Sequence, residues 1–243
     1  MNIKTIMMLG YMYGFLWLRR NMLSMIWLFS TPFTILFLFY VVAGEGALIT
    51  ALIGSYIMLF VNAGVGVIGD AVWNKHELKF QDILVASPVT VFDYIAGIAL
   101  AEIFFTLPGI VVLLIPLILY QGSFYWLFTL VAVPTITWLI VSAISFYFST
   151  YVPNARNGWQ VGVLLNLLLT ILPPVFYPIE KIPDAIRPIA YLVPTTHSAL
   201  LLKNSAGIIQ LGTIDILFSW SYLLIALVTL TLLTINKAQW REN

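Results

Sequence analysis

The stretch that decides the fold is residues 103–155, IFFTLPGIVVLLIPLILYQGSFYWLFTLVAVPTITWLIVSAISFYFSTYVPNA, which holds 53 residues without a charged side chain. A helix that crosses the hydrocarbon core of a bilayer, about 30 Å thick, needs roughly 20 mostly apolar residues. The stretch is therefore long enough for most of one span, a turn near residues 121–123, and a second span. It predicts a chain that lies within a membrane.

Four more uncharged, apolar intervals flank this stretch, at 21–44, 46–69, 157–179 and 216–236. If the third span begins near residue 92, the intervals predict six transmembrane helices, at 22–43, 47–68, 92–119, 125–148, 159–177 and 214–236. No internal repeat or low-complexity linker interrupts them. The expected fold class is therefore all-α, a polytopic membrane protein forming a single domain over residues 1–243.

The composition excludes several classes of function. Hydrophobic residues make up 61% of the chain and charged residues 9%, whereas a soluble domain carries about 25% charged residues. A water-facing globular enzyme is thus excluded, because its surface would lack charge. Eleven basic and ten acidic residues leave a net charge of +1 and no basic face for nucleic acid. The chain has no cysteine, so disulfides and thiolate metal sites are absent.

Cofactor motifs are also missing from the sequence. His76-Glu77 begins like the zinc motif HExxH, but Phe80 stands where the second histidine would be needed. The chain has one other histidine, His197, and it falls on the opposite side of the predicted membrane. No phosphate-binding motif of the form GxxxxGK[ST] occurs. We therefore expect no cofactor on this chain, and any ATP and Mg²⁺ would be bound by another chain.

The N-terminal segment 3–18 is predicted to be an amphipathic helix at the membrane interface, not a cleavable signal peptide. Its Gly10 and Gly14 have GxxxG spacing, which allows close helix packing but also occurs by chance. With six spans and both termini in the cytoplasm, eight basic residues lie inside and three outside, as the positive-inside rule requires. We expect a multi-pass protein of the cell membrane.

The loop after the second span is predicted to contain an amphipathic helix at 72–84. Trp73, Phe80 and Leu84 fall on one helical face, and charged residues cover the rest. Ser87-Pro88 ends the helix, because the residue before proline avoids the α region. Such a helix could lie on the membrane surface, dock into a partner's groove, or serve as a solvated linker.

The outer segment 178–212 follows a proline-dense stretch that leaves the fifth span short. Small helices near 183–191 and 195–206 are expected, and they are too apolar to stand in water alone. We expect a re-entrant or interfacial hairpin, because irregular backbone is tolerated in a membrane where protein shelters it.

The arrangement resembles the ABC-2 type transporter permeases. The resemblance rests on QDILVASPVT at 81–90 and on PVFYPIEKIP at 174–183 leading to VPTT at 193–196. The architecture is similar over essentially the whole chain. The family's Glu-Arg-Glu and Gly-Thr pattern is absent, because this chain has Lys75-His76-Glu77 and Lys79-Phe80 in its place.

The resemblance implies a non-catalytic permease subunit of an ATP-driven exporter, working by alternating access. Its implied partners are separate ABC ATPase subunits, which would bind ATP and Mg²⁺, and a second permease copy, identical or paralogous. The helix at 72–84 would then be the ATPase-docking element. Its residues would be the anchors Trp73, Phe80 and Leu84 and a polar rim of Lys75, Glu77, Lys79 and Asp82.

Candidate residues for the substrate path or a gate are Glu102, Trp138, Phe176, Tyr177 and His197. Glu102 lies about ten residues into the third span, where an acid costs roughly 2.5–3.5 kcal/mol and must face protein or water. It could line the path, carry protons, bond a neighbouring helix, or lie near the membrane interface in a tilted span. Glycines 64, 66 and 69 with Asn62 give the second span a narrow surface, which favours close packing over a substrate groove.

Two other functions remain open from the sequence. One is a proton-coupled secondary transporter using Glu102, although no inverted repeat is visible. The other is a membrane-embedded enzyme, although polar catalytic residues do not cluster at one depth. The cargo is not specified: amphipathic compounds, lipids, glycans, peptides and drugs all fit an apolar cavity.

Overall fold

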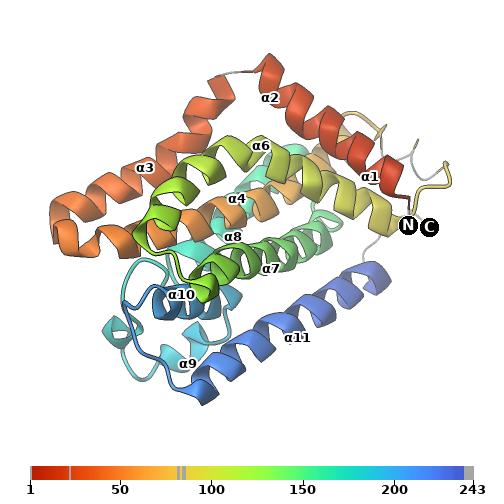
Figure 1. Ribbon diagram of the computed structural model, residues 1–243. Coiled ribbons are helices and arrows are strands. Elements are labelled where there is room, and N and C mark those ends of the chain that lie inside the picture. Colours follow the sequence, from red (N-terminus) through yellow and green to blue (C-terminus); the bar gives the residue numbers. More distant parts are fainter. Residues whose placement is uncertain (1, 22, 81–82, 84–85, 238–243) are drawn as a thin grey trace.

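The computed structural model describes residues 2–21, 23–80, 83 and 86–237, and throughout this part of the chain the regular elements are helices (Figure 1). The all-α prediction is confirmed for these residues. Among the described residues, the long helices of the bundle are α3 (Leu23–Ala43), α4 (Leu48–His76), α6 (Val91–Tyr120), α7 (Phe124–Ser149), α8 (Ala155–Thr170) and α11 (Thr213–Lys237).

Among the described residues, four helices are long and apolar enough to cross a membrane, namely α4, α6, α7 and α11. The apolar stretch found on α3 is shorter, Phe29–Ala43, and α8 has 16 residues. The fifth predicted span, 159–177, is therefore wrong in its extent. It begins earlier, where the Asn154 side chain caps Asn157 at 2.9 Å, and it ends at Thr170 before Pro173 and Pro174.

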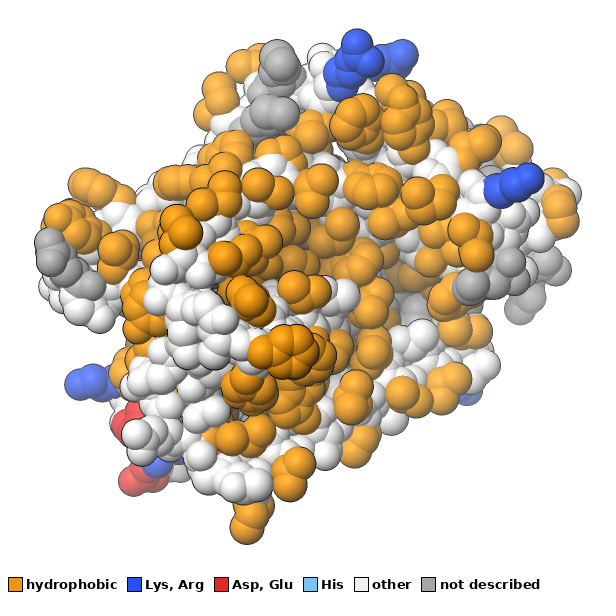
Figure 2. All heavy atoms as spheres, in the orientation of Figure 1, with side chains coloured by type: hydrophobic (Ala, Val, Ile, Leu, Met, Phe, Trp, Pro, Cys, Tyr) orange, Lys and Arg blue, Asp and Glu red, His pale blue; other side chains and the backbone are white. Residues whose placement is uncertain are grey.

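Helix α4 forms the centre of the bundle. It lies against α3, α6, α7, α8 and α10 (Figure 1). Its side chains, including the fully buried Ile53, Ile57 and Leu59, form most of the main hydrophobic core. By contrast, the outer faces of α6 and α11 are exposed and apolar, as the broad apolar surface in Figure 2 shows. This distribution is typical of a bundle whose periphery faces lipid.

The N-terminal helix is a rod of three consecutive segments, α1 (Ile3–Gly10), a π-helical segment (Tyr11–Phe15) and α2 (Leu16–Arg20). It covers the predicted range 3–18 and packs along α6 (Figure 1). The glycine spacing is structural: a side chain at Gly10 would meet Leu100, and one at Gly14 would overlap the Ala101 carbonyl. Chance is therefore not the explanation for this GxxxG pair.

The far end of the bundle holds α9 (Arg187–Ala190) and α10 (Pro194–Ser205), close to the small helices expected there. Helix α10 is buried along most of its length and contacts α7, α11 and α4. Hydrogen bonds join it to α7: the Thr137 and Ser198 hydroxyls lie 2.6 Å apart, and the Thr129 hydroxyl donates to Ser205 at 2.8 Å. The bundle thus carries an internal helix at this end.

The helix predicted at 72–84 is not one segment. Helix α4 continues through Trp73 to His76, two turns beyond the span expected at 47–68, and the chain then turns at residues 77–79. Lys79 has a φ of 51°, in the left-handed region, which breaks the helix at this point. Of the predicted docking residues, Asp82 and Leu84 lie outside the described residues.

Candidate functional site

The residues of α4 that are not fully buried form a single stripe, in which Trp73 is exposed and the others are half-buried. Between residues 51 and 74, every side chain of this helix is buried except Asn62, Gly66, Asp70 and Trp73. Their spacing of four, four and three residues places them on one side of the helix. We call these four residues the α4 stripe. Two of the four are polar or charged, although the helix as a whole is apolar.

The middle of the α4 stripe carries a pair of carboxyl groups. Asp70 is hydrogen-bonded to Glu102, which reaches across from α6. The Glu102 carboxyl lies directly over Gly66, where any side chain would overlap it. A hydrogen bond between two carboxyl groups requires a shared proton. The predicted bond from Glu102 to a neighbouring helix is thus present, but the sequence analysis did not identify its partner.

Helix α8 borders the α4 stripe on another side. The Asn166 amide donates a hydrogen bond to the Asn62 carbonyl oxygen, and the Thr170 hydroxyl donates to the Asn166 backbone oxygen at 2.7 Å. Nearer to Trp73, the Trp159 ring lies on Gly69, 2.9 Å from the position a β-carbon would take. Gly64 packs in the same way on Val141 of α7. The predicted close packing of this glycine-rich surface is confirmed.

The predicted docking residues fall into two groups. Trp73 is 46% exposed at the end of the α4 stripe, and Leu78 and Ile83 beyond it are 52% and 65% exposed. Glu77 and Lys79 are exposed and Lys75 is half-buried. Phe80, in contrast, is half-buried with its ring against Tyr13 of the N-terminal helix, at a centroid distance of 5.8 Å. The exposed apolar surface of this loop therefore excludes Phe80.

These features, a central apolar helix with a polar stripe and an exposed apolar loop at its end, can be compared with known proteins. A family model described as ABC-2 type transporter matches residues 5–203. The chain belongs to the ABC-2 type transporter family. The match extends from the N-terminal helix into α10, so it includes the whole α4 stripe. No protein of curated function matches the chain.

In this ABC-2 permease the predicted path and gate residues do not converge. Glu102 joins the α4 stripe. Trp138 is half-buried on α7 between two parts of the core, and its indole nitrogen has no hydrogen-bond partner among the described residues. Phe176 is buried, stacks on Phe39 and packs on Gly54. It is a core residue in the described chain.

The two remaining predicted residues, Tyr177 and His197, belong to the far end. The Tyr177 hydroxyl donates to the Leu172 carbonyl. His197 is fully buried, and its ring nitrogens lie 2.8 Å from the Tyr191 carbonyl and 3.2 Å from the Ser219 hydroxyl. Burial lowers the pKa of His197 and favours its neutral form. These contacts join the α9–α10 segment to α11.

A buried lysine that the sequence did not single out lies at the same end. Lys203 is 5% exposed, and its ammonium donates to the carbonyls of Pro174 at 2.8 Å and Tyr177 at 3.0 Å. Burial lowers the pKa of Lys203 to about 8, although Glu180 opposes the shift. The residue stabilises the irregular chain after α8, whose carbonyls lack helical partners. The available signal was a lysine that directly follows the apolar run at 199–202.

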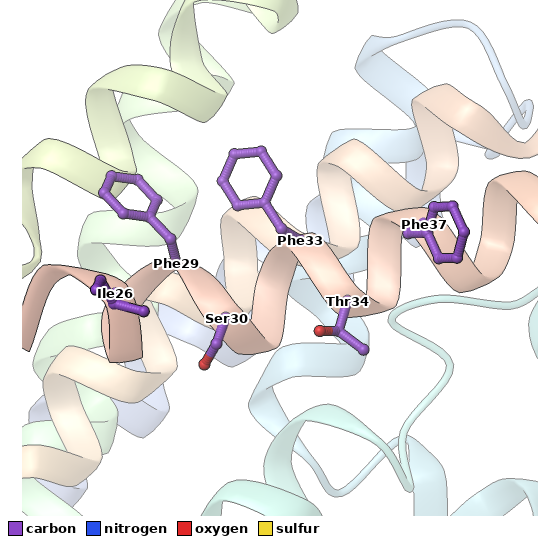
Figure 3. A pocket seen from close by; sticks show the side chains of 6 residues that line it. All are labelled: Ile26, Phe29, Ser30, Phe33, Thr34 and Phe37. Carbon is purple, nitrogen blue, oxygen red and sulfur yellow. The ribbon is translucent and has the colours of Figure 1, made fainter.

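A groove of about 610 Å³ runs along α3 in the ABC-2 permease (Figure 3). Its lining consists of residues from this one helix, Ile26, Phe29, Ser30, Phe33, Thr34 and Phe37. Phe33 and Phe37 are 42% and 69% exposed. One side of the groove is aromatic, and the other carries two hydroxyl groups (Figure 3).

Proposed function

We propose that this chain is the permease subunit of an ATP-driven exporter that moves an amphipathic, lipid, glycan, peptide or drug-like cargo out of the cytoplasm. In this proposal six helices cross the membrane, with α3 and α8 completing the set of four clear spans. The end that holds the start of α1 faces the cytoplasm, as the distribution of basic residues favours. A separate ATPase subunit binds ATP and Mg²⁺ and supplies the energy.

The α4 stripe is the observation that carries this proposal. A polar stripe with a carboxyl pair is costly in an apolar helix unless it faces protein or water. It ends at Trp73, and the chain beyond it carries the exposed residues Leu78 and Ile83. A partner that moves this loop would therefore act on the helix that carries the stripe. Aromatic and aliphatic anchors of this kind dominate the binding energy of protein interfaces.

The groove on α3 supports pairing with a second permease copy. An open groove lined by one helix is complete only when another surface covers it, and its mixed aromatic and hydroxyl lining suits a helix in a membrane. With two copies facing each other, alternating access would change the exposure of α3 and of the α4 stripe. Whether the second copy is identical or paralogous is an outcome for experiment.

Co-purification tests the proposal directly. The chain is expressed with the ATPases of its host, extracted in detergent and purified through a tag. An ABC ATPase is expected in a fixed ratio to the chain, and it is expected to be lost in Trp73→Ala combined with Leu78→Ala. Tyr151→Ala is the matched control, because Tyr151 is an equally exposed aromatic residue after α7. A wild-type chain that purifies without any ATPase would contradict the proposal.

The carboxyl pair favours one second candidate, a proton-coupled transporter using Glu102. Two hydrogen-bonded carboxyl groups can hold and release a proton. This candidate expects the purified chain alone, in liposomes with a trapped pH-sensitive dye, to conduct protons and to lose the conduction in Glu102→Gln. Proton-tight liposomes would exclude it.

A further inference from the structure

His197 connects two elements at the far end of the bundle, where α9, α10 and α11 meet (Figure 1). It lies in the first turn of α10 and is fully buried. Its Nε2 atom lies 2.8 Å from the carbonyl oxygen of Tyr191, just after α9, and its Nδ1 atom lies 3.2 Å from the hydroxyl of Ser219 on α11. A single imidazole ring therefore joins the chain before α10 to α11.

The two contacts determine which ring nitrogen carries the hydrogen when the imidazole is neutral. A carbonyl oxygen accepts hydrogen bonds and cannot donate them, so Nε2 donates to Tyr191. Nδ1 then has no hydrogen and accepts one from the Ser219 hydroxyl. If Nδ1 gains a proton, it becomes a donor, and the bond to Ser219 has to reverse. The neutral imidazole therefore satisfies both partners as they stand.

Aromatic rings surround the imidazole on several sides. The Tyr222 ring is stacked on it at a centroid distance of 4.2 Å, and the Phe218 ring meets it edge-on at 5.6 Å, both from α11. The Tyr191 ring lies 6.0 Å away. The Tyr222 hydroxyl also donates to the Leu192 carbonyl, which joins α11 a second time to the chain before α10. The imidazole thus lies among rings rather than in water.

The nearest titratable groups do not supply a negative charge to the imidazole. No described residue forms an ion pair with it. The titratable side chains in contact with it are Tyr191 and Tyr222, which are uncharged near neutral pH. On α11, Asp215 lies one turn before Ser219, and its side chain is exposed.

The charged residues of the other neighbouring elements have partners of their own or lie elsewhere. Arg187 of α9 is paired with Asp184 at 2.8 Å, and Lys203 on α10 itself donates to two backbone carbonyls. Helix α7 has no charged residue, α4 has charged residues only from Asp70 onward, and α8 has one, Arg156, in its first turn. A protonated imidazole would therefore have no buried anion beside it.

Burial disfavours the charged form of an imidazole, and it lowers the pKa of His197 although the bond to Tyr191 opposes the shift. When the ring reaches water, its pKa returns to the ordinary value of 6.5. The released ring then binds protons more readily than the buried ring. Acid therefore favours release: the buried arrangement keeps its full stability above pH 6.5 and loses stability as the pH falls below this value.

We propose that His197 is a pH-sensitive latch, which holds α9 and the first turn of α10 against α11 at neutral pH and releases them in acid. Opening separates Tyr191 and His197 from Ser219 and Tyr222, while α4, α6 and α7 stay packed. The latch is independent of the exporter mechanism, because it needs neither ATP nor a second chain. In the proposed orientation this end of the bundle faces outward, so the latch responds to the pH outside the cell.

A cysteine placed beside His197 reports the opening, because the chain has no cysteine of its own. Thr195 is fully buried in the same turn, and its hydroxyl has no partner among the described residues, so Thr195→Cys removes no hydrogen bond found there. Labelling of the purified full chain by a fluorescent maleimide is timed at about pH 7.5 and about pH 5, on either side of the ordinary histidine pKa of about 6.5.

The labelling rate needs a reference, because the reactivity of a thiol itself depends on pH. Each Thr195→Cys rate is divided by the rate of Leu192→Cys, at a side chain that is 69% exposed. This ratio is expected to rise about fivefold or more in acid, within the usual range of coupling between two equilibria.

His197→Gln is expected to remove the rise, because its amide can donate to the Tyr191 carbonyl and does not titrate. His76→Gln is the matched control, since this histidine lies at the end of α4, near Val152, and is expected to leave the rise unchanged. Ser145→Cys on α7 is equally buried, and its hydroxyl also lacks a partner in the described chain. It is expected to stay unlabelled at both pH values. Labelling of Ser145→Cys in acid would show general unfolding and would overturn the latch.

Nuclear magnetic resonance decides the case in which His197→Gln does not fold. With ¹⁵N-labelled histidine the wild-type chain gives signals from two imidazole rings, and His76→Gln leaves those of His197. At neutral pH the hydrogen is expected on Nε2, and protonation is expected over the pH range in which Thr195→Cys labelling rises. A rise that persists in His197→Gln overturns the latch, as does a rise while His197 stays neutral, or a protonated His197 without a rise.

Discussion

Asp70 on α4 and Glu102 on α6 are joined by a hydrogen bond between their carboxyl groups, in the middle of the α4 stripe. The bond connects the central helix to a helix that begins just after the exposed loop. Both acids lie within helices that can cross a membrane. Each therefore depends on the other for a polar partner in an apolar environment.

Two substitutions of Glu102 should separate its hydrogen bond from its ability to ionise. Glutamine keeps a hydrogen-bond donor and cannot ionise, whereas alanine has neither property. In Glu102→Gln the amide still donates to Asp70, so the thermal unfolding temperature in detergent is expected to stay near that of the wild type. Glu102→Ala leaves Asp70 without this partner and is expected to cost about 1–3 kcal/mol. Glu77→Ala, at an exposed glutamate, is the control. Equal losses in the glutamine and alanine variants would contradict the bond.

Gly66 should tolerate a side chain only when Glu102 is shortened. A methyl group at Gly66 overlaps the Glu102 carboxyl, so Gly66→Ala is expected to destabilise the wild-type chain by roughly 1–3 kcal/mol. The same substitution in a Glu102→Ala background is expected to cost much less. The difference is the coupling energy of a double-mutant cycle, measured by thermal unfolding. Additive effects would show that the two residues do not touch.

The sequence predicts the helices well where apolar length is the deciding signal. Helix α7 was expected at 125–148 and is found at Phe124–Ser149. Helix α4 was expected to end at residue 68, because Asp70 looks like the start of a polar loop, yet it continues to His76. An acid can lie inside this helix because Glu102 from another helix bonds it. Such a partner is 32 positions away, and local patterns do not contain it.

The candidate site was predictable only in part, for a similar reason. The position of Trp73 on an exposed surface follows from its neighbourhood of charged residues. Phe80 has the same neighbourhood, but the N-terminal rod covers it. The rod's place beside α6 depends on Gly10 and Gly14, which lie against α6, and on Gly97, which lies against Leu9 of the rod. The burial of Lys203 and His197 depends likewise on how α10 enters the bundle.

Gly14 should be sensitive to substitution although it lies in an N-terminal segment. Any side chain there overlaps the Ala101 carbonyl, and a backbone contact cannot relax as a flexible side chain does. Gly14→Ala is expected to lower the free energy of unfolding by about 1–3 kcal/mol and to raise proteolysis of residues before α3. Gly122→Ala is the matched control, because open space surrounds Gly122. Unchanged stability and proteolysis in Gly14→Ala would contradict the close contact between the rod and α6.

Lys203 should make stability rise with pH in the alkaline range. Its pKa is about 8 in the folded chain, below the ordinary value of 10.5. Between pH 8 and pH 10.5 the unfolded chain binds more protons than the folded chain. The free energy of unfolding therefore increases as the pH rises through this range. The neutral amine still has two N–H groups for the carbonyls of Pro174 and Tyr177. Thermal unfolding followed from pH 7.5 to 11 in detergent is expected to show this slope in the wild type and in Lys181→Met, where the lysine is exposed. Lys203→Met is expected to flatten it, and a slope that survives would mean that another group titrates in this range.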